Sequence, residues 1–238
     1  MKANSLKHLI VTIIATIFLT APSFAASWNA LDRIPYVGTM IAKKNSLPSA
    51  IKFEAVDNPG NNKYAITTNK IQINKSDIEF TSNDNELAYI LSYELGKVIV
   101  KNINPNNKFC NDEDIDAMGI DLMINGGYNP LAGISVLEKE HKNNEAEYLY
   151  NYISYNYPSK ILAGYNSDEY SAFLSHLEPL LRQIKANKRK LAKFNRQQAK
   201  INKARIKRLL KYDQNTSKLS SWGVTKDLIQ SITEPEEK

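Results

Sequence analysis

Cysteine is almost absent from this chain. Cys110 is the only one among 238 residues, so no internal disulfide framework exists. We expect this thiol to be buried and inert, because free cysteine packs as a small apolar group; the alternative is a bond to another chain. The sequence also lacks internal repeats and long linkers rich in glycine, serine or proline. Its length is enough for one core with an appendage.

Acidic residues are missing from one stretch near the C-terminus. Between Arg182 and Lys211 there are 13 lysines and arginines and no aspartate or glutamate. The rest of the chain after residue 25 has 16 basic and 25 acidic residues. An acidic body therefore carries a strongly basic segment, residues 182–211.

The N-terminus is typical of a secretory signal peptide. Lys2 and Lys7 give a positive start, residues 9–20 form an apolar run, and small residues precede and include Ala25. The run is too short and too rich in threonine for a comfortable spanning helix, although an uncleaved anchor is the alternative. We expect cleavage near Ala25 and export, with a periplasmic or extracellular location.

The first part of the mature chain predicts a helix and a small sheet. Residues 28–45 have a helical pattern with turns at Pro35 and Gly38. Residues 51–56 and 63–73 have strand character and are separated by turn residues, which indicates a hairpin. The pattern becomes helical from Asn83 onward. The fold class we expect is therefore α+β and predominantly helical.

The helix that starts after Asn83 or Asp84 is the clearest element. Asn83 and Glu86 stand three residues apart, as a capping pair does. The apolar residues Leu87, Ile90, Leu91 and Val98 recur at helical spacing and mark an inward stripe. Glu94 falls on the same stripe, and a carboxylate on an apolar face is costly without a partner. The alternative is that Glu94 reaches water at the edge of the stripe.

A second helix is predicted from Asn111 or Asp112 to Asn125, ended by Gly126-Gly127. Four carboxylates crowd its first turns: Asp112, Glu113, Asp114 and Asp116. Some acidity at a helix N-terminus is favourable, but this many carboxylates indicate a cationic partner nearby. Asn129-Pro130 then predicts the start of a third helix.

The C-terminal part has a long helical pattern from residue 167 to about Tyr212, interrupted or restarted at Pro179. An apolar stripe runs through Ile184, Leu191, Phe194 and Ile201. Thirteen positive charges make an isolated solvated helix marginal, so an anionic partner is plausible. The candidates are an anionic membrane surface, another envelope protein, or the acidic body of the chain itself. Nucleic acid is not expected, because export removes the chain from most of it.

The order of these features resembles metallopeptidase family 48, the HtpX-like zinc metallopeptidases. In that family a strand reading about N-A-Y-A precedes a zinc helix, D-E-L-A-x-x-L-x-H-E-x-x-H; a second helix carries E-x-x-A-D, and G-Y-D-P follows. The corresponding segments here are residues 62–65 (NKYA), 85–97 (NELAYILSYELGK), 112–116 (DEDID) and 127–130 (GYNP). The family's later His-Pro dipeptide matches Tyr157-Pro158. The resemblance covers residues 28–158 and implies a zincin-like helical bundle.

The chain departs from the family pattern at the positions of the metal ligands. The positions of the metal ligands carry Tyr93, Lys97 and Tyr157 in place of histidine, and Asp112 in place of glutamate. The resemblance leaves Glu94 at the position of the general base and Asp116 at that of the supporting aspartate. Both are vestigial if the metal is lost.

The coordination chemistry of zinc also predicts that the metal is lost. Catalytic zinc takes three protein ligands and keeps one open position. A neutral tyrosine is a poor ligand and a protonated lysine offers no lone pair. The mature chain has only His141 and His176, outside the motif, which we interpret as ordinary surface or helix residues. We therefore predict that zinc is lost, that no cofactor replaces it, and that hydrolysis by this mechanism is absent.

The lysine suggests what replaced the metal. Glu94 and Lys97 are three residues apart on one helix, and the resemblance brings Asp112 and Asp116 to the same place. We predict an ion-pair cluster of Lys97, Glu94, Asp112 and Asp116, with the ammonium offsetting repulsion among the carboxylates. Tyr93 would fill the remaining room.

Three functions remain open at this point. The first is a non-catalytic binding or scaffold protein of the bacterial envelope, built as a signal peptide (1–25), a degenerate peptidase-like domain (26–166) and a helical segment (167–238). The second is a hydrolase with residual or unconventional activity through Glu94 and Asp116. The third is a membrane-surface adaptor that acts through residues 182–211.

Overall fold

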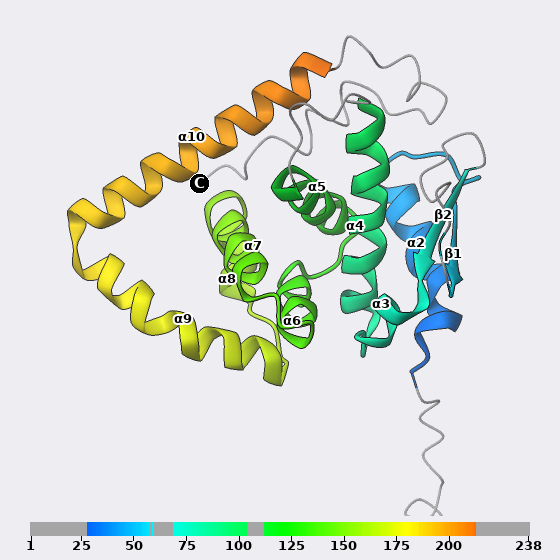
Figure 1. Ribbon diagram of the computed structural model, residues 1–238, viewed down its shortest axis with the longest axis horizontal. Coiled ribbons are helices and arrows are strands. Elements are labelled where there is room, and N and C mark those ends of the chain that lie inside the picture. Colours follow the sequence, from blue (N-terminus) through cyan, green and yellow to red (C-terminus); the bar gives the residue numbers. More distant parts are fainter. Residues whose placement is uncertain (1–27, 58, 60–68, 104–111, 213–238) are drawn as a thin grey trace, which may run out of the picture.

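The computed structural model describes residues 28–57, 59, 69–103 and 112–212. The predicted signal peptide, Cys110 and residues 62–65 lie outside them. The predicted fold class is confirmed: the described part is mostly helical with one small sheet. In Figure 1, α4 runs through the middle of the molecule, with α2, α3 and the sheet on one side and α5 to α10 on the other.

The N-terminal part is one helix followed by a two-stranded sheet. Helix α2 spans Ala30–Lys44 and continues through Pro35 and Gly38, where turns were expected. Strands β1 (Lys52–Val56) and β2 (Lys70–Asn74) pair in parallel. A hairpin between these two strands is therefore wrong, since a hairpin joins antiparallel strands; residues 63–68 of the second predicted strand lie outside the described residues. Alternating side chains of β2 are fully buried, which fixes its register against the core.

Helix α4 (Asp84–Ile103) follows the short helix α3 (Lys75–Glu79). The predicted cap is confirmed, because the Asn83 side chain accepts from the backbone N–H groups of Asn85 and Glu86 at 3.0 and 3.1 Å. The Glu86 carboxylate accepts from the backbone N–H of Ser82 at 2.7 Å and forms a buried ion pair with Lys139 at the same distance. The Asn83 cap and the contacts of Glu86 with Ser82 and Lys139 thus fix the start of α4.

Four further helices complete the body: α5 (Asp112–Asn125), α6 (Leu131–Lys139), α7 (Asn143–Asn156) and α8 (Pro158–Ala163). The bounds of α5 agree with the prediction, and Gly127 follows it with a φ of +88°, which suits glycine. Helix α6 begins after Asn129, whose side chain accepts from the N–H of Leu131 at 3.1 Å. The apolar faces of these helices and of α4 form one continuous core.

The C-terminal segment forms two helices, α9 (Asp168–Ala186) and α10 (Lys188–Tyr212). Pro179 lies inside α9, so the break expected there falls instead at Asn187, whose side chain caps α10. Figure 1 shows that the two helices meet at an angle and that α6, α7 and α8 lie between them. Three side chains of α9 join the core: Tyr170, Phe173 and Leu177. No described helix combines the length and apolarity needed to cross a bilayer.

Candidate functional site

A buried ion pair lies in the middle of α4. The Nζ of Lys97 lies 2.7 Å from Oε1 of Glu94, one turn earlier on the helix. The Glu94 side chain is 3% exposed and that of Lys97 is 18% exposed. Glu94 therefore points inward, as its place on the apolar stripe predicts, and its charge is met by the lysine that stands at the second histidine position of the family motif.

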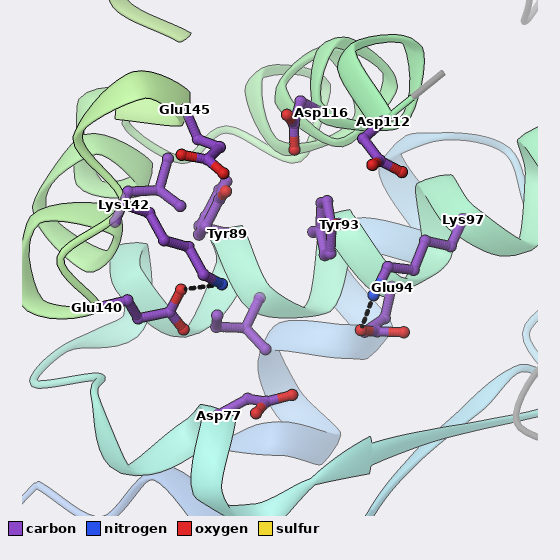
Figure 2. Close-up of a pocket in the computed structure, with 12 residues that line it drawn as sticks. Asp77, Tyr89, Tyr93, Glu94, Lys97, Asp112, Asp116, Glu140, Lys142 and Glu145 are labelled. Carbon is purple, nitrogen blue, oxygen red and sulfur yellow. Dashed lines mark hydrogen bonds and ion pairs between the residues drawn. The ribbon is translucent and has the colours of Figure 1, made fainter. Parts of the chain in front are cut away.

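Tyr93 lies beside this pair. The Lys97 ammonium sits over the Tyr93 ring, 4.2 Å from the ring centroid, in a cation–π contact. The ring also stacks on Tyr89, with centroids 6.2 Å apart. Figure 2 shows the Tyr93 ring between the Glu94–Lys97 pair and the carboxylates of α5. Tyr93 therefore lies at the wall of the pocket beside Lys97.

Two glycines bring α5 against this part of α4. A Cβ added at Gly119 would lie 3.0 Å from Cα of Tyr93, and one at Gly96 would lie 3.1 Å from the backbone N of Gly119. The two helices therefore touch backbone to backbone. This close approach places Asp112 and Asp116, on the first turns of α5, at the same pocket as Glu94 and Lys97.

The pocket between these elements has a volume of about 230 Å³. Its wall also includes charged residues from α3 and from the α6–α7 connection, which the sequence did not point to. The polar and aromatic residues that line it are Asp77, Tyr89, Tyr93, Glu94, Lys97, Asp112, Asp116, Glu140, Lys142 and Glu145. Figure 2 shows them converging on the pocket from both sides of α4. Six carboxylates face two ammonium groups, so the site is acidic.

Asp116 is a strongly perturbed carboxyl group of the pocket. It is 7% exposed, and burial raises its pKa to about 7, with further upward contributions from Asp112 and Glu145. Lys97 and Lys142 lower the pKa, but not enough to offset burial. Among the described residues, none donates a hydrogen bond to this carboxylate or forms an ion pair with it.

The predicted ion-pair cluster therefore contains fewer ion pairs than expected. Glu94 and Lys97 pair as predicted, but Asp112 and Asp116 do not form ion pairs with Lys97; they act on the site through space. The Lys97 ammonium is turned toward Glu94 and the Tyr93 ring (Figure 2) and therefore away from the carboxylates of α5. Lys97 thus meets one carboxylate rather than three.

Tyr157 does not line this pocket. Its hydroxyl donates to Oδ1 of Asp121 on α5 at 2.6 Å, and the Tyr152 hydroxyl donates to the same oxygen at 2.7 Å. The structure therefore separates Tyr157 from the other three positions that the resemblance assigned to metal ligands.

Asp121 is the centre of a second buried cluster, which anchors the basic segment. The Arg205 guanidinium of α10 lies 2.5 Å from the carboxylate of Asp121, and both side chains are almost fully buried. Burial raises the pKa of Asp121, while the Arg205 charge and the two phenols oppose that rise. Asn202 of α10 donates to the Asn156 side chain at 2.8 Å. The basic segment thus docks on the acidic body.

Sequence reasoning missed this second cluster, although a signal was present. Arg205 stands four residues after Ile201, on the apolar stripe of α10. A charged residue on an apolar face is the signal that singled out Glu94. In a segment with 13 basic residues, one arginine did not stand out.

The pocket does not fit a catalytic zinc ion. Within the part of the chain that the structure describes, no three histidine, cysteine, aspartate or glutamate side chains are arranged to hold a metal. An ammonium group occupies the place where the resemblance would put an imidazole. His141 and His176 are exposed, as expected. The loss of zinc stays a prediction that a metal analysis must test.

The Asp116→Asn variant should be more stable than the wild type at alkaline pH. A raised pKa means that folded Asp116 binds its proton more tightly than unfolded Asp116. This contribution to stability is therefore lost as the pH rises from about 4 to about 7. Asparagine removes the buried charge, so we expect a gain of up to about 4 kcal/mol in the free energy of unfolding at pH 8.

That gain should shrink toward zero near pH 4. Urea unfolding at several pH values measures it, and the exposed Asp32→Asn variant is the control. A gain of the same size at pH 5 and pH 8 would contradict the raised pKa.

We compared the chain with known proteins by sequence and by structure. No family model, curated protein or solved structure matches it. The resemblance to metallopeptidase family 48 therefore stays a prediction that rests on the motif residues of the sequence.

Proposed function

We propose that this chain is a non-catalytic binding or scaffold protein of the bacterial envelope, built on a metallopeptidase-like scaffold. One observation carries the proposal: the ammonium of Lys97 lies 2.7 Å from Glu94, at the residue where the family has its second zinc ligand. The location in the envelope rests on the N-terminal sequence.

The chemistry of the site supports a loss of hydrolysis. A glutamate acts as the general base of a zinc peptidase by taking a proton from a metal-polarised water. Here Glu94 forms a salt bridge instead, and the Tyr93 ring lies beside Lys97 at the wall of the pocket. The site retains a shaped, charged cavity suited to binding.

A metal analysis combined with a casein cleavage assay tests this proposal. We expect the purified chain to contain far less than one zinc per molecule after dialysis and to leave casein intact. A triple variant, Tyr93→His, Lys97→His and Asp112→Glu, is the matched control, because it restores the ligand types of the family at the pocket. Stoichiometric zinc in the wild type, or cleavage that depends on Glu94, would revive the hydrolase alternative.

A second function is favoured by the outer face of α10. This helix docks through Asn202 and Arg205, while seven other basic residues of the helix, among those whose side chains are described, face solvent. The exposed ones are Arg189, Lys190, Lys193, Arg196, Lys200, Lys203 and Lys207. Docking on the body therefore leaves a positive face for an anionic membrane surface.

We expect the full chain to float with liposomes that contain anionic lipid and not with neutral ones. Binding should fall steeply with salt, because exposed charges are screened over about 10 Å at 0.1 M ionic strength. Replacing Lys193, Arg196, Lys200 and Lys203 by glutamine should abolish flotation. Flotation unaffected by salt and by these replacements would end the adaptor hypothesis.

A further inference from the structure

The pocket contains more negative charge than its own lysines neutralise. Lys97 pairs with Glu94 at 2.7 Å, and Lys142 pairs with Glu140 at 2.6 Å. Four other carboxylates line the same cavity and have no basic partner among the described residues: Asp77, Asp112, Asp116 and Glu145. The pocket is therefore arranged to receive positive charge.

Asp116 distinguishes this pocket from an ordinary acidic surface. The residue is 7% exposed, it has no hydrogen-bond or ion-pair partner in the described part of the chain, and Figure 2 shows its carboxylate directed into the cavity. A buried carboxylate without a partner destabilises the fold. Lys97 and Lys142 offset only part of that cost, and a cationic group from outside the chain would offset more of it.

The aromatic wall indicates what kind of cation fits. Tyr89 and Tyr93 form a stacked pair beside the carboxylates, and the Tyr93 ring already holds one ammonium over its face. Carboxylates next to aromatic faces bind guanidinium and ammonium groups of side chains. Arginine matches best, because its planar fork can bond one carboxylate at two points while its face stacks on a ring.

The geometry disfavours a bare metal ion. A metal ion needs several oxygens within about 2–2.6 Å, and no described group of three acidic side chains is so arranged. The cavity, of about 230 Å³, is also far larger than the roughly 30 Å³ that one water molecule takes in the liquid. Its carboxylates come from α3, α5 and α7, so they surround a long side chain better than a point charge.

We propose that this pocket binds an arginine or lysine side chain of an extended peptide, with Asp116 as the buried anion that receives the cationic group. The proposal deepens the proposed function and rests on it, since it takes the former catalytic pocket as a site that holds peptide without cutting it.

The test is a retention experiment on the immobilised full chain. One pool contains capped hexapeptides with a central arginine among random neutral residues, and the matched pool has citrulline in that position. Citrulline keeps the shape of arginine and removes the charge. Mass spectrometry of the retained peptides should show at least tenfold more of the arginine pool than of the citrulline pool.

Two variants test whether peptide retention depends on the pocket. Asp116→Asn should reduce retention of the arginine pool at least tenfold, whereas Glu178→Gln, an exposed change on α9, should leave it unaltered. Because Asp116→Asn is expected to stabilise the fold, loss of retention cannot be ascribed to unfolding. Equal retention of the two pools, no retention of either, or an unaffected Asp116→Asn variant would overturn the proposal.

The same spectra separate this inference from the proposed function. If peptides are retained intact without preference for arginine, the cation site is wrong and the non-catalytic function stands. If cleaved peptides appear, the non-catalytic function is wrong whatever the preference.

Discussion

Replacing Arg205 with methionine should lower the free energy of unfolding by about 3–5 kcal/mol, the cost of leaving one member of a buried ion pair alone. The Asp121 carboxylate would lose its counter-charge at 2.5 Å, and the Tyr152 hydroxyl would lose the Arg205 donor at 2.6 Å. Denaturant unfolding followed by circular dichroism measures the loss. Limited proteolysis should also cut α10 sooner, because Arg205 is its principal buried anchor.

The control is Arg196→Met on the exposed face of the same helix, which should change stability by about 0.5 kcal/mol or less. A double variant, Arg205→Met with Asp121→Asn, should recover part of the loss, since it removes the uncompensated charge. If Arg205→Met behaves like Arg196→Met, the docking of the basic segment on the body is wrong.

Replacing Lys97 with alanine should destabilise the chain by about 3 kcal/mol. The value lies at the low end for a buried pair because 18% of the Lys97 side chain is exposed. The loss arises mainly from Glu94, which stays buried without its ammonium partner, and partly from the cation–π contact with Tyr93. Lys97→Met should cost only somewhat less, because methionine restores packing but not charge.

Adding Glu94→Gln to either variant should recover part of the stability, since the amide needs no counter-charge. Lys44→Ala, an exposed lysine at the end of α2, is the matched control. Equal effects of Lys97→Ala and Lys44→Ala would mean that the salt bridge on α4 contributes nothing to the fold.

Replacing Asp116 should raise the free energy of unfolding, whereas replacing Lys97 should lower it. The two residues therefore have different roles within one pocket. Lys97 neutralises a buried charge and should stabilise the fold. Asp116 is a buried charge that no described side chain neutralises, and it should destabilise the fold. Function is commonly lost when a destabilised group of a functional site is replaced by a stabilising one. The pocket thus combines a structural ion pair with the carboxylate that we propose as a binding group.

Local sequence determined much of the helical body. The Asn83–Glu86 spacing predicted the start of α4, Gly126-Gly127 predicted the end of α5, and apolar spacing predicted the faces that these helices bury. The same spacing placed Glu94 on a buried face and Lys97 within reach of it. These features depend on residues within one or two turns of each other, where the geometry of a helix leaves few choices.

Tertiary structure decided the pairings between distant segments. Whether β1 and β2 pair in parallel depends on the path between them, and alternation within a strand carries no information on it. Tyr157 bonds Asp121 and not the pocket, and Arg205 is buried while its basic neighbours are exposed, because packing of α10 on α5 and α7 selects them. Periodicity states which face is inward, but only the assembled helices determine which charge meets which.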